Sequence, residues 1–357
     1  MTHRSHSVRA LAALLVLFLC ILALAGCGAR SGGATRIQGA GATFPAPIYQ
    51  KWFSEYNKAN PGVVFDYQSI GSGAGIQQIT EKTVDFGGSD APMNTDQLAK
   101  VQGQILHIPT VLGAVVLTYN VQGVTGELKF TPEAIADIFL GKIKKWNDPA
   151  IATVNEGVQL PDVNINVVHR SEASGTTYVF TDYLSKVSPE WKNGPGTGTQ
   201  PQWPVGLGAK GNEMVTGQVK QTPNSIGYVE LIYAEGNKLP VALIKNAAGQ
   251  WIKPSLDSIT AAAAGAAGQI PDDLRVSITN APGASAYPIS SFTYLLVYKE
   301  QADQAKGKAL VDFLWWATHD GEAMAKEKLY APLPAEVVQK AEEKIKSITY
   351  QGKPLRG

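Results

Sequence analysis

The spacing of apolar residues along the chain alternates between a strand pattern and a helix pattern. Apolar, partly β-branched runs predict strands at residues 36–42, 63–70, 84–89, 105–120, 163–168, 225–229 and 287–298. Apolar residues three or four positions apart predict helices at 76–82, 94–101, 132–140, 212–222, 230–235, 256–267, 302–328 and 334–348, and two more that begin at about Pro45 and Tyr178. Strands that alternate with helices indicate an α/β fold with a mostly parallel sheet, covered on both faces.

Two of the expected strands are candidates for crossings between lobes. Residues 105–120 form a long β-branched run that Pro109 and Gly113 interrupt, and residues 287–298 form the return crossing. We therefore expect a discontinuous first α/β lobe of residues 36–112 and 288–357 and a second α/β lobe of residues 113–287. Residues 189–211, rich in Gly, Pro and Trp, predict a long surface loop, and residues 241–251 predict a hairpin.

The first 26 residues have the character of an export signal. Arg4 and Arg9 precede an apolar run, residues 10–25, which as a helix would span about 24 Å, less than the ~30 Å of a bilayer core. The run ends in Leu-Ala-Gly-Cys27, which resembles the lipobox of bacterial lipoproteins. This resemblance implies an acylated Cys27 and an extracytoplasmic protein held at the membrane by lipid, with residues 27–35 as a flexible tether.

Cysteine content and charge exclude several classes of function for the mature chain. The chain has two cysteines, and Cys20 leaves with the signal, so neither an internal disulfide nor a thiolate metal site is possible. The loss of Arg4 and Arg9 changes the formal charge from +1 to −1. A nearly neutral chain argues against nucleic acid as a partner, because nucleic-acid binding requires a basic face.

Three strand–turn–helix units each place small or hydroxyl residues at a helix start. The backbone N–H groups of a first helical turn lack intrahelical partners and lie at the positive end of the helix dipole, so they can hold an anion. The alternative for any one unit is an ordinary helix cap, with a surface arginine in the third unit. Taken together, the units offer donors from two lobes: Thr43, Phe44, Ser72, Arg170, Ser174, Gly175 and Thr176.

Asp90 ends the strand at residues 84–89, where the same sheet edge would bring it to the cleft. At about 4 Å and an effective dielectric constant of about 20, a carboxylate and an anion repel each other by ~4 kcal/mol. That repulsion disappears if the ligand carries a proton that Asp90 can accept, as phosphate does near neutral pH and sulfate does not. The alternative is a turn aspartate before Pro92.

Several motifs in order resemble the phosphate-binding protein family of bacterial high-affinity phosphate ABC transporters. They are residues 39–47 (GAGATFPAP), 70–72 (IGS), 84–92 (VDFGGSDAP), 141–146 (GKIKKW) and 174–176 (SGT). The resemblance covers essentially the whole mature chain. It implies a two-lobed periplasmic-binding-protein fold, each lobe a mixed sheet flanked by helices, that closes over one phosphate and uses no cofactor or metal.

The same resemblance implies roles for individual residues and partners. Phosphate would be held by Thr43, the backbone N–H of Phe44, Ser72, Asp90 as proton acceptor, Arg170, Ser174, Gly175 and Thr176. The family often has Asp, salt-bridged to the arginine, where this chain has Glu172. The implied partners are inorganic phosphate and the membrane permease subunits of the transporter, and we expect a monomer.

Two other functions remain open at the level of sequence. A phosphatase or serine hydrolase could use Ser72 or Ser174, but no G-x-S-x-G motif surrounds either serine. The chain has neither a Walker A motif nor a G-x-G-x-x-G motif. His169 should point to the opposite face of its strand from Arg170. A binder of another tetrahedral oxyanion, such as sulfate or molybdate, is the second alternative, and Asp90 argues against it.

Overall fold

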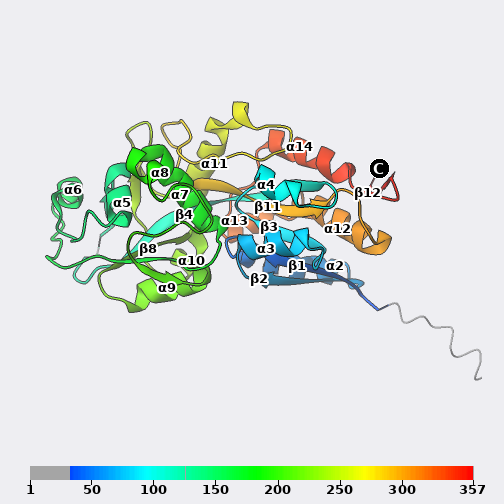
Figure 1. Ribbon diagram of the computed structural model, residues 1–357, viewed down its shortest axis with the longest axis horizontal. Helices are drawn as coiled ribbons and strands as arrows, with labels where there is room; N and C mark the ends of the chain where they lie inside the picture. The colour runs from blue at the N-terminus through cyan, green and yellow to red at the C-terminus, as the bar shows by residue number, and fades with distance from the viewer. Residues whose placement is uncertain (1–32, 125, 357) are drawn as a thin grey trace, which may run out of the picture. The chain divides into compact units, whose positions relative to one another are not determined.

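An eight-stranded mixed sheet with the strand order β2-β1-β3-β11-β4-β8-β6-β7 connects the two halves of the fold in a computed structural model (Figure 1). The model describes residues 33–124 and 126–356. The strands are β1 (Thr35–Gly41), β2 (Val63–Ser69), β3 (Phe86–Ser89), β4 (Ile105–Asn120), β5 (Lys129–Phe130), β6 (Asn166–Arg170), β7 (Leu207–Ala209), β8 (Ser225–Glu230), β9 (Leu243–Lys245), β10 (Trp251–Ile252), β11 (Ser290–Tyr298), β12 (Thr349–Tyr350) and β13 (Lys353–Pro354).

Helices flank the sheet in both halves, as the alternating apolar pattern predicts. The α-helices are α2 (Ala46–Ala59), α3 (Ser72–Thr80), α4 (Thr95–Ala99), α5 (Pro132–Phe139), α6 (Pro149–Ala152), α7 (Gly175–Val187), α8 (Pro189–Asn193), α9 (Gly211–Gln221), α10 (Leu231–Gly236), α11 (Leu256–Gly265), α12 (Gln304–Ala317), α13 (Glu322–Glu327) and α14 (Ala335–Lys346). Short 3-10 turns are η2 (Thr153–Asn155) and η3 (Ala267–Gln269).

Strand β4 belongs to both halves of the sheet. It pairs antiparallel with β11 up to Ala114, which lies opposite Ser290, and with β8 from Val115, which lies opposite Glu230. Every residue of β4 except the last is buried, which matches its almost continuous apolar sequence. Parallel pairs lie at the two ends of the sheet, β2-β1-β3 in one half and β8-β6-β7 in the other.

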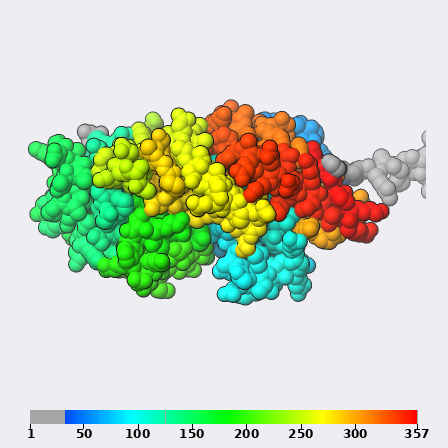
Figure 2. Space-filling view, turned by 90° about the horizontal axis from the view of Figure 1, so that it is seen from above, coloured from blue at the N-terminus to red at the C-terminus, as the bar shows by residue number. Residues whose placement is uncertain are grey.

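The segment between η3 and β11 contacts both halves. Lys186 of α7 donates to Ser277 Oγ at 2.7 Å, whereas Arg275 Nη1 donates to the carbonyl of Met93 at 2.9 Å. Figure 2 shows this segment, in yellow, against the green surface of the second half and the cyan surface of the first. The two halves are thus connected on the surface as well as through the sheet.

Two predicted elements differ from the observed ones. Residues 189–211 are not one loop: Pro189 starts α8, which Ser188 caps by accepting the N–H of Trp191 at 3.2 Å, and β7 pairs parallel with β6. The expected helix 302–328 is two helices, α12 and α13. The backbone breaks before Gly321, whose carbonyl accepts the indole N–H of Trp52 at 2.8 Å. The same carbonyl accepts the N–H of Met324 at 3.1 Å as α13 begins, and a Cβ atom added to Gly321 would lie 2.9 Å from the backbone of Ala317.

The predicted hairpin at residues 241–251 is confirmed as the antiparallel pair β9 and β10. The predicted signal segment, the lipobox with Cys27 and nearly all of the predicted tether lie outside the described residues. In the part of the chain that the structure describes, no helix has both the length and the apolar character that crossing a membrane requires.

The buried Trp52 of α2 provides a test of how the C-terminal helices are held. Trp52→Ala removes a fully buried side chain and its bond to Gly321, so we expect a loss of about 3–5 kcal/mol in the free energy of unfolding. Urea unfolding followed by far-UV circular dichroism measures the loss. Trp251→Ala, which changes a half-buried indole in β10, is the control and should cost less. Equal losses would contradict this role for Trp52.

Candidate functional site

All eight residues predicted for the site lie in the buried region between the two halves of the sheet. Thr43 and Phe44 precede α2, Ser72 begins α3 and Asp90 follows β3. Arg170 ends β6, Ser174 caps α7, and Gly175 and Thr176 begin it. Each of these residues is buried, including the charged groups Asp90 and Arg170, which are 1% and 2% exposed. Three helix starts therefore surround the same enclosed region.

The start of α7 packs directly against residues of the first half. A Cβ atom added to Gly175 would lie 2.3 Å from Ser72 Oγ and 2.5 Å from Asp90 Oδ2, so only glycine fits this approach. The N–H of Gly73 in α3 donates to the carbonyl of Ala173 at 3.0 Å, which is a second contact between the same segments. Residues separated by about 80 positions or more are thus brought together, as the strand–turn–helix pattern predicts.

Asp90 has one occupied and one free carboxylate oxygen. Thr293 Oγ1 of β11 donates to Asp90 Oδ1 at 2.8 Å, whereas Oδ2 is buried and has no hydrogen-bond partner within residues 33–124 and 126–356. Burial raises the pKa of Asp90 from 3.8 to about 7, although the Thr293 bond and the charge of Arg170 act in the opposite direction. A buried acceptor without a donor is costly, so Oδ2 is suited to a ligand that brings a proton.

Arg170 is paired with Glu172, as the family resemblance implies. Nε donates to Glu172 Oε1 at 3.0 Å, Nη2 donates to the same oxygen, and Nη1 donates to Thr176 Oγ1 at 3.2 Å. Burial acts to raise the pKa of Glu172, but the bonds and charge of Arg170 and the N–H of Gly211 at 2.9 Å outweigh it, so this pKa is lowered. The arginine charge is therefore largely balanced within the protein.

The helix starts supply backbone donors. The N–H groups of Ser72, Gly175 and Thr176 have no acceptor among the described residues, as expected for first-turn positions. Ser174 Oγ accepts the N–H of Thr177 at 3.1 Å and so caps α7. His169 lies away from this region, with its ring stacked on Trp203 at 4.7 Å between centroids, as the strand alternation predicts.

Four residues near the site were missed by the sequence patterns. Asn212 of α9 donates to Thr43 Oγ1 at 2.8 Å, and Thr293 donates to Asp90. Tyr233 and Tyr330 each donate at 2.6 Å, to the carbonyls of Thr43 and Phe44 respectively. A helix was predicted to begin at Asn212, but nothing in the sequence indicated what its amide would contact.

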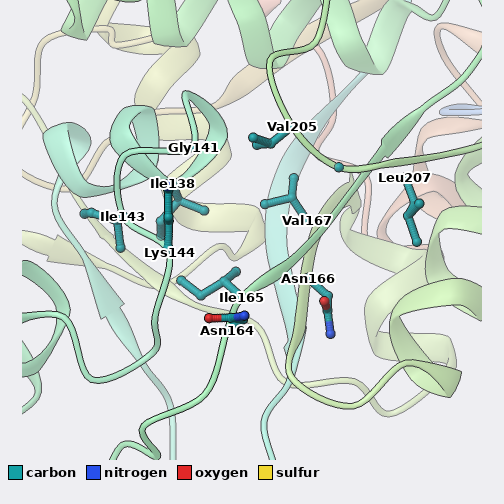
Figure 3. A pocket seen from close by; sticks show the side chains of 11 residues that line it. Ile138, Gly141, Ile143, Lys144, Asn164, Ile165, Asn166, Val167, Val205 and Leu207 are labelled. Atoms are coloured by element: carbon teal, nitrogen blue, oxygen red, sulfur yellow. The ribbon is translucent and has the colours of Figure 1, made fainter.

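One surface hollow of the described residues lies in the second half, away from these residues. It measures about 480 Å³ and is lined by residues of the second half, including Ile138, Ile165, Val167 and Val205 (Figure 3). None of the eight predicted residues lines it. Within residues 33–124 and 126–356, no group of three or more His, Cys, Asp or Glu side chains is arranged to hold a metal ion.

The fold and the arrangement of the site define a solute-binding protein of the two-lobed class. The family model for the PBP superfamily domain matches residues 28–320. A phosphate-binding protein from Stenotrophomonas maltophilia superposes with a TM-score of 0.67 at 19% identity, covering 87% of this chain and 94% of that one. Such solved structures confirm the predicted two-lobed α/β fold.

Curated sequences identify the family more closely. The phosphate-binding protein PstS of Pasteurella multocida is 49% identical over 315 residues, which cover 88% of this chain and 91% of the relative. PstS of Xylella fastidiosa is 47% identical over 310 residues, covering 87% and 84%. The chain belongs to the PstS family of phosphate-binding proteins.

The raised pKa of Asp90 predicts a dependence of stability on pH. Because the folded state binds this proton more tightly than the unfolded state, wild-type stability should fall relative to Asp90→Asn as the pH rises from about 4 to about 7. One proton limits the slope to about 1.4 kcal/mol per pH unit. Urea unfolding of both proteins in phosphate-free buffers measures it. A difference that stays constant between pH 4 and pH 8 would contradict the raised pKa.

Proposed function

We propose that this chain is an extracytoplasmic solute-binding protein that captures inorganic phosphate between two closing lobes and delivers it to an ABC importer. The single observation that carries the proposal is that Asp90 Oδ2, which the start of α7 approaches at Gly175, and the N–H groups of Ser72, Gly175 and Thr176 all lack hydrogen-bond partners among the described residues. Such a site offers many donors and one acceptor. The proposed ligand residues are Thr43, Phe44, Ser72, Asp90, Arg170, Ser174, Gly175 and Thr176.

The charge balance of the site favours an acidic oxyanion over a fully ionised one. The charge of Glu172 balances that of Arg170. Since Asp90 adds no positive charge, the proposed site has no excess of positive charge to attract an anion. An ion without a proton would face the Asp90 carboxylate at a repulsion of about 4 kcal/mol at 4 Å. Phosphate can instead donate a hydrogen bond to Oδ2. Each hydrogen bond to a charged group contributes ~1.5–3 kcal/mol, so a full shell of donors can offset the desolvation of the ion.

The proposal also assigns the parts of the chain. Residues 36–112 and 288–357 form the first lobe, residues 113–287 form the second, and β4 and β11 cross between them. Residues 1–26 are the signal, residues 27–35 are the tether, and Cys27 carries the lipid that holds a monomer at the membrane. The partner proteins are the membrane permease subunits of a phosphate transporter.

In this proposal the chain binds phosphate without catalysis. The Oγ atoms of Ser72 and Ser174 accept backbone N–H groups, at 3.2 and 3.1 Å. The three described histidines bond to groups other than these serines: His107 to the N–H of Met93, His169 to the carbonyl of Arg170, and His319 to the carbonyl of Trp315 and the Glu342 carboxylate. No activated serine supports the hydrolase alternative. Incubation with a chromogenic phosphate ester tests this point, because turnover would contradict a binding role.

Titration calorimetry with phosphate and with sulfate tests the function directly. The wild type should bind phosphate and discriminate against sulfate. Asp90→Asn should narrow the phosphate-to-sulfate ratio of dissociation constants by about 10-fold or more, because the amide can donate to sulfate and no longer repels it. Asp85→Asn, a carboxylate that pairs with Lys306 outside the site, is the control and should leave the ratio unchanged. An unchanged ratio in Asp90→Asn would remove the proton-acceptor role.

Arg170→Ala should weaken phosphate binding by more than about 1 kcal/mol, since it removes a charged donor. The same change leaves the Glu172 carboxylate without its ion-pair partner. The double variant Arg170→Ala/Glu172→Gln therefore separates the loss of a ligand donor from the loss of this pairing. If Arg170 contacts the ligand, the double variant stays weak. Recovery of wild-type affinity in the double variant would show that Arg170 only neutralises Glu172. Calorimetry under the conditions above gives both values.

A further inference from the structure

The amide side chain of Asn212 lies between a hydroxyl group of each half. Nδ2 donates to Thr43 Oγ1 at 2.8 Å and to Thr176 Oγ1 at 3.2 Å, and the backbone N–H of Asn212 reaches Thr43 Oγ1 at 3.3 Å. The residue is fully buried. One side chain thus connects two of the proposed phosphate ligands, which come from the loop before α2 and from the start of α7.

The orientation of this amide is fixed by a partner that can only donate. Asn212 Oδ1 accepts the backbone N–H of Glu230, at the end of β8, at 3.0 Å. A flipped amide would place its NH₂ group against that N–H group, and two donors would face each other. The NH₂ group must therefore face the two threonines, and both of its hydrogens are used there.

This orientation determines the direction of the threonine hydroxyl groups. A hydroxyl group has one hydrogen to donate and two acceptor positions. The two acceptor positions of Thr43 are taken by the N–H and Nδ2 of Asn212. Those of Thr176 are taken by Arg170 Nη1 and Asn212 Nδ2. Each threonine hydroxyl group can therefore act toward a ligand only as a hydrogen-bond donor.

We infer that Asn212 is a positioning residue that fixes Thr43 and Thr176 as hydrogen-bond donors to the anion and couples the two lobes when the site forms. The inference rests on the proposed phosphate-binding function and deepens it. It excludes a phosphate proton at these two positions, which agrees with Asp90 as the proton acceptor, since Oδ2 is buried without a hydrogen-bond partner among the described residues. Asn212 itself is not a ligand in this arrangement.

The serine ligands are oriented by a different route. Ser72 Oγ accepts the N–H of Asp90, and Ser174 Oγ accepts the N–H of Thr177. Substitutions other than to proline leave these backbone N–H groups in place, whereas the orientation of the two threonines depends on a side chain. Mutation of Asn212 therefore tests the threonine pair separately from the serines.

The experiment measures phosphate binding by calorimetry for Asn212→Leu, which keeps the size of the side chain and removes its donors. We expect an affinity loss of at least about 10-fold. Asn155→Leu is the matched control, because Asn155 is also a buried amide with three bonds, to Lys129 and Ile151, but lies outside the site. Its phosphate affinity should equal that of the wild type.

A double-mutant cycle distinguishes positioning from a general structural role. In a Thr43→Val/Thr176→Val background the hydroxyl groups are absent, so Asn212→Leu should cost less than about 3-fold. Asn212→Asp keeps the acceptor for Glu230 but turns the threonine hydroxyls toward itself, so it should lose more affinity than Asn212→Leu. If Asn212→Leu does not fold, Asn212→Asp still tests whether phosphate affinity depends on the donors of Asn212.

Several outcomes would overturn the inference. Wild-type affinity in a folded Asn212 variant, or an equal loss in both threonine backgrounds, would overturn it while the phosphate function stands. A wild type that does not bind phosphate would overturn the proposed function and this inference together. The wild-type and Asn155→Leu titrations distinguish these cases.

Discussion

The ion pair between Arg170 and Glu172 sets the conditions under which the rest of the site must work. The guanidinium is the strongest donor near the three helix starts, yet its charge is balanced by a carboxylate two residues away. Net charge cannot then hold an anion. What is left are oriented dipoles, the first-turn N–H groups and the hydroxyl groups, which are strong only where water is excluded.

The fold satisfies this condition because it buries the N–H and hydroxyl donors of both halves in a region from which water is excluded. The shared strand β4 joins the two halves of the sheet, and the approach of Gly175 to Ser72 and Asp90 leaves no room for a side chain. The same closeness explains the raised pKa of Asp90, because a carboxylate in such surroundings loses its hydration. Burial therefore has two effects on the site: it strengthens the hydrogen-bond donors, and it raises the pKa of the one acceptor, Asp90.

Much of this could be predicted from sequence because its signals are local. A strand, a turn of small residues and a helix start occupy about a dozen consecutive positions, so Ser72, Asp90 and the residues around Ser174 could be placed on one sheet edge. Asn212, Thr293 and Tyr330 could not, since their bonds to Thr43, Asp90 and Phe44 span at least 169 positions and no sequence pattern indicates these contacts. The break in the expected helix 302–328 also has a distant contact, because Trp52, which bonds to Gly321, is 269 positions away.

The bond from Tyr330 to the carbonyl of Phe44 has a consequence for how the molecule is made. It spans 286 positions, and Thr293 reaches Asp90 across 203. The loop at residues 43–44 is synthesised among the first parts of the fold, yet it acquires its last neighbours among the final ones. A nascent chain that ends before residue 330 lacks the hydroxyl group that bonds to the loop at residues 43–44, so the ion can be bound only when the polypeptide is almost complete.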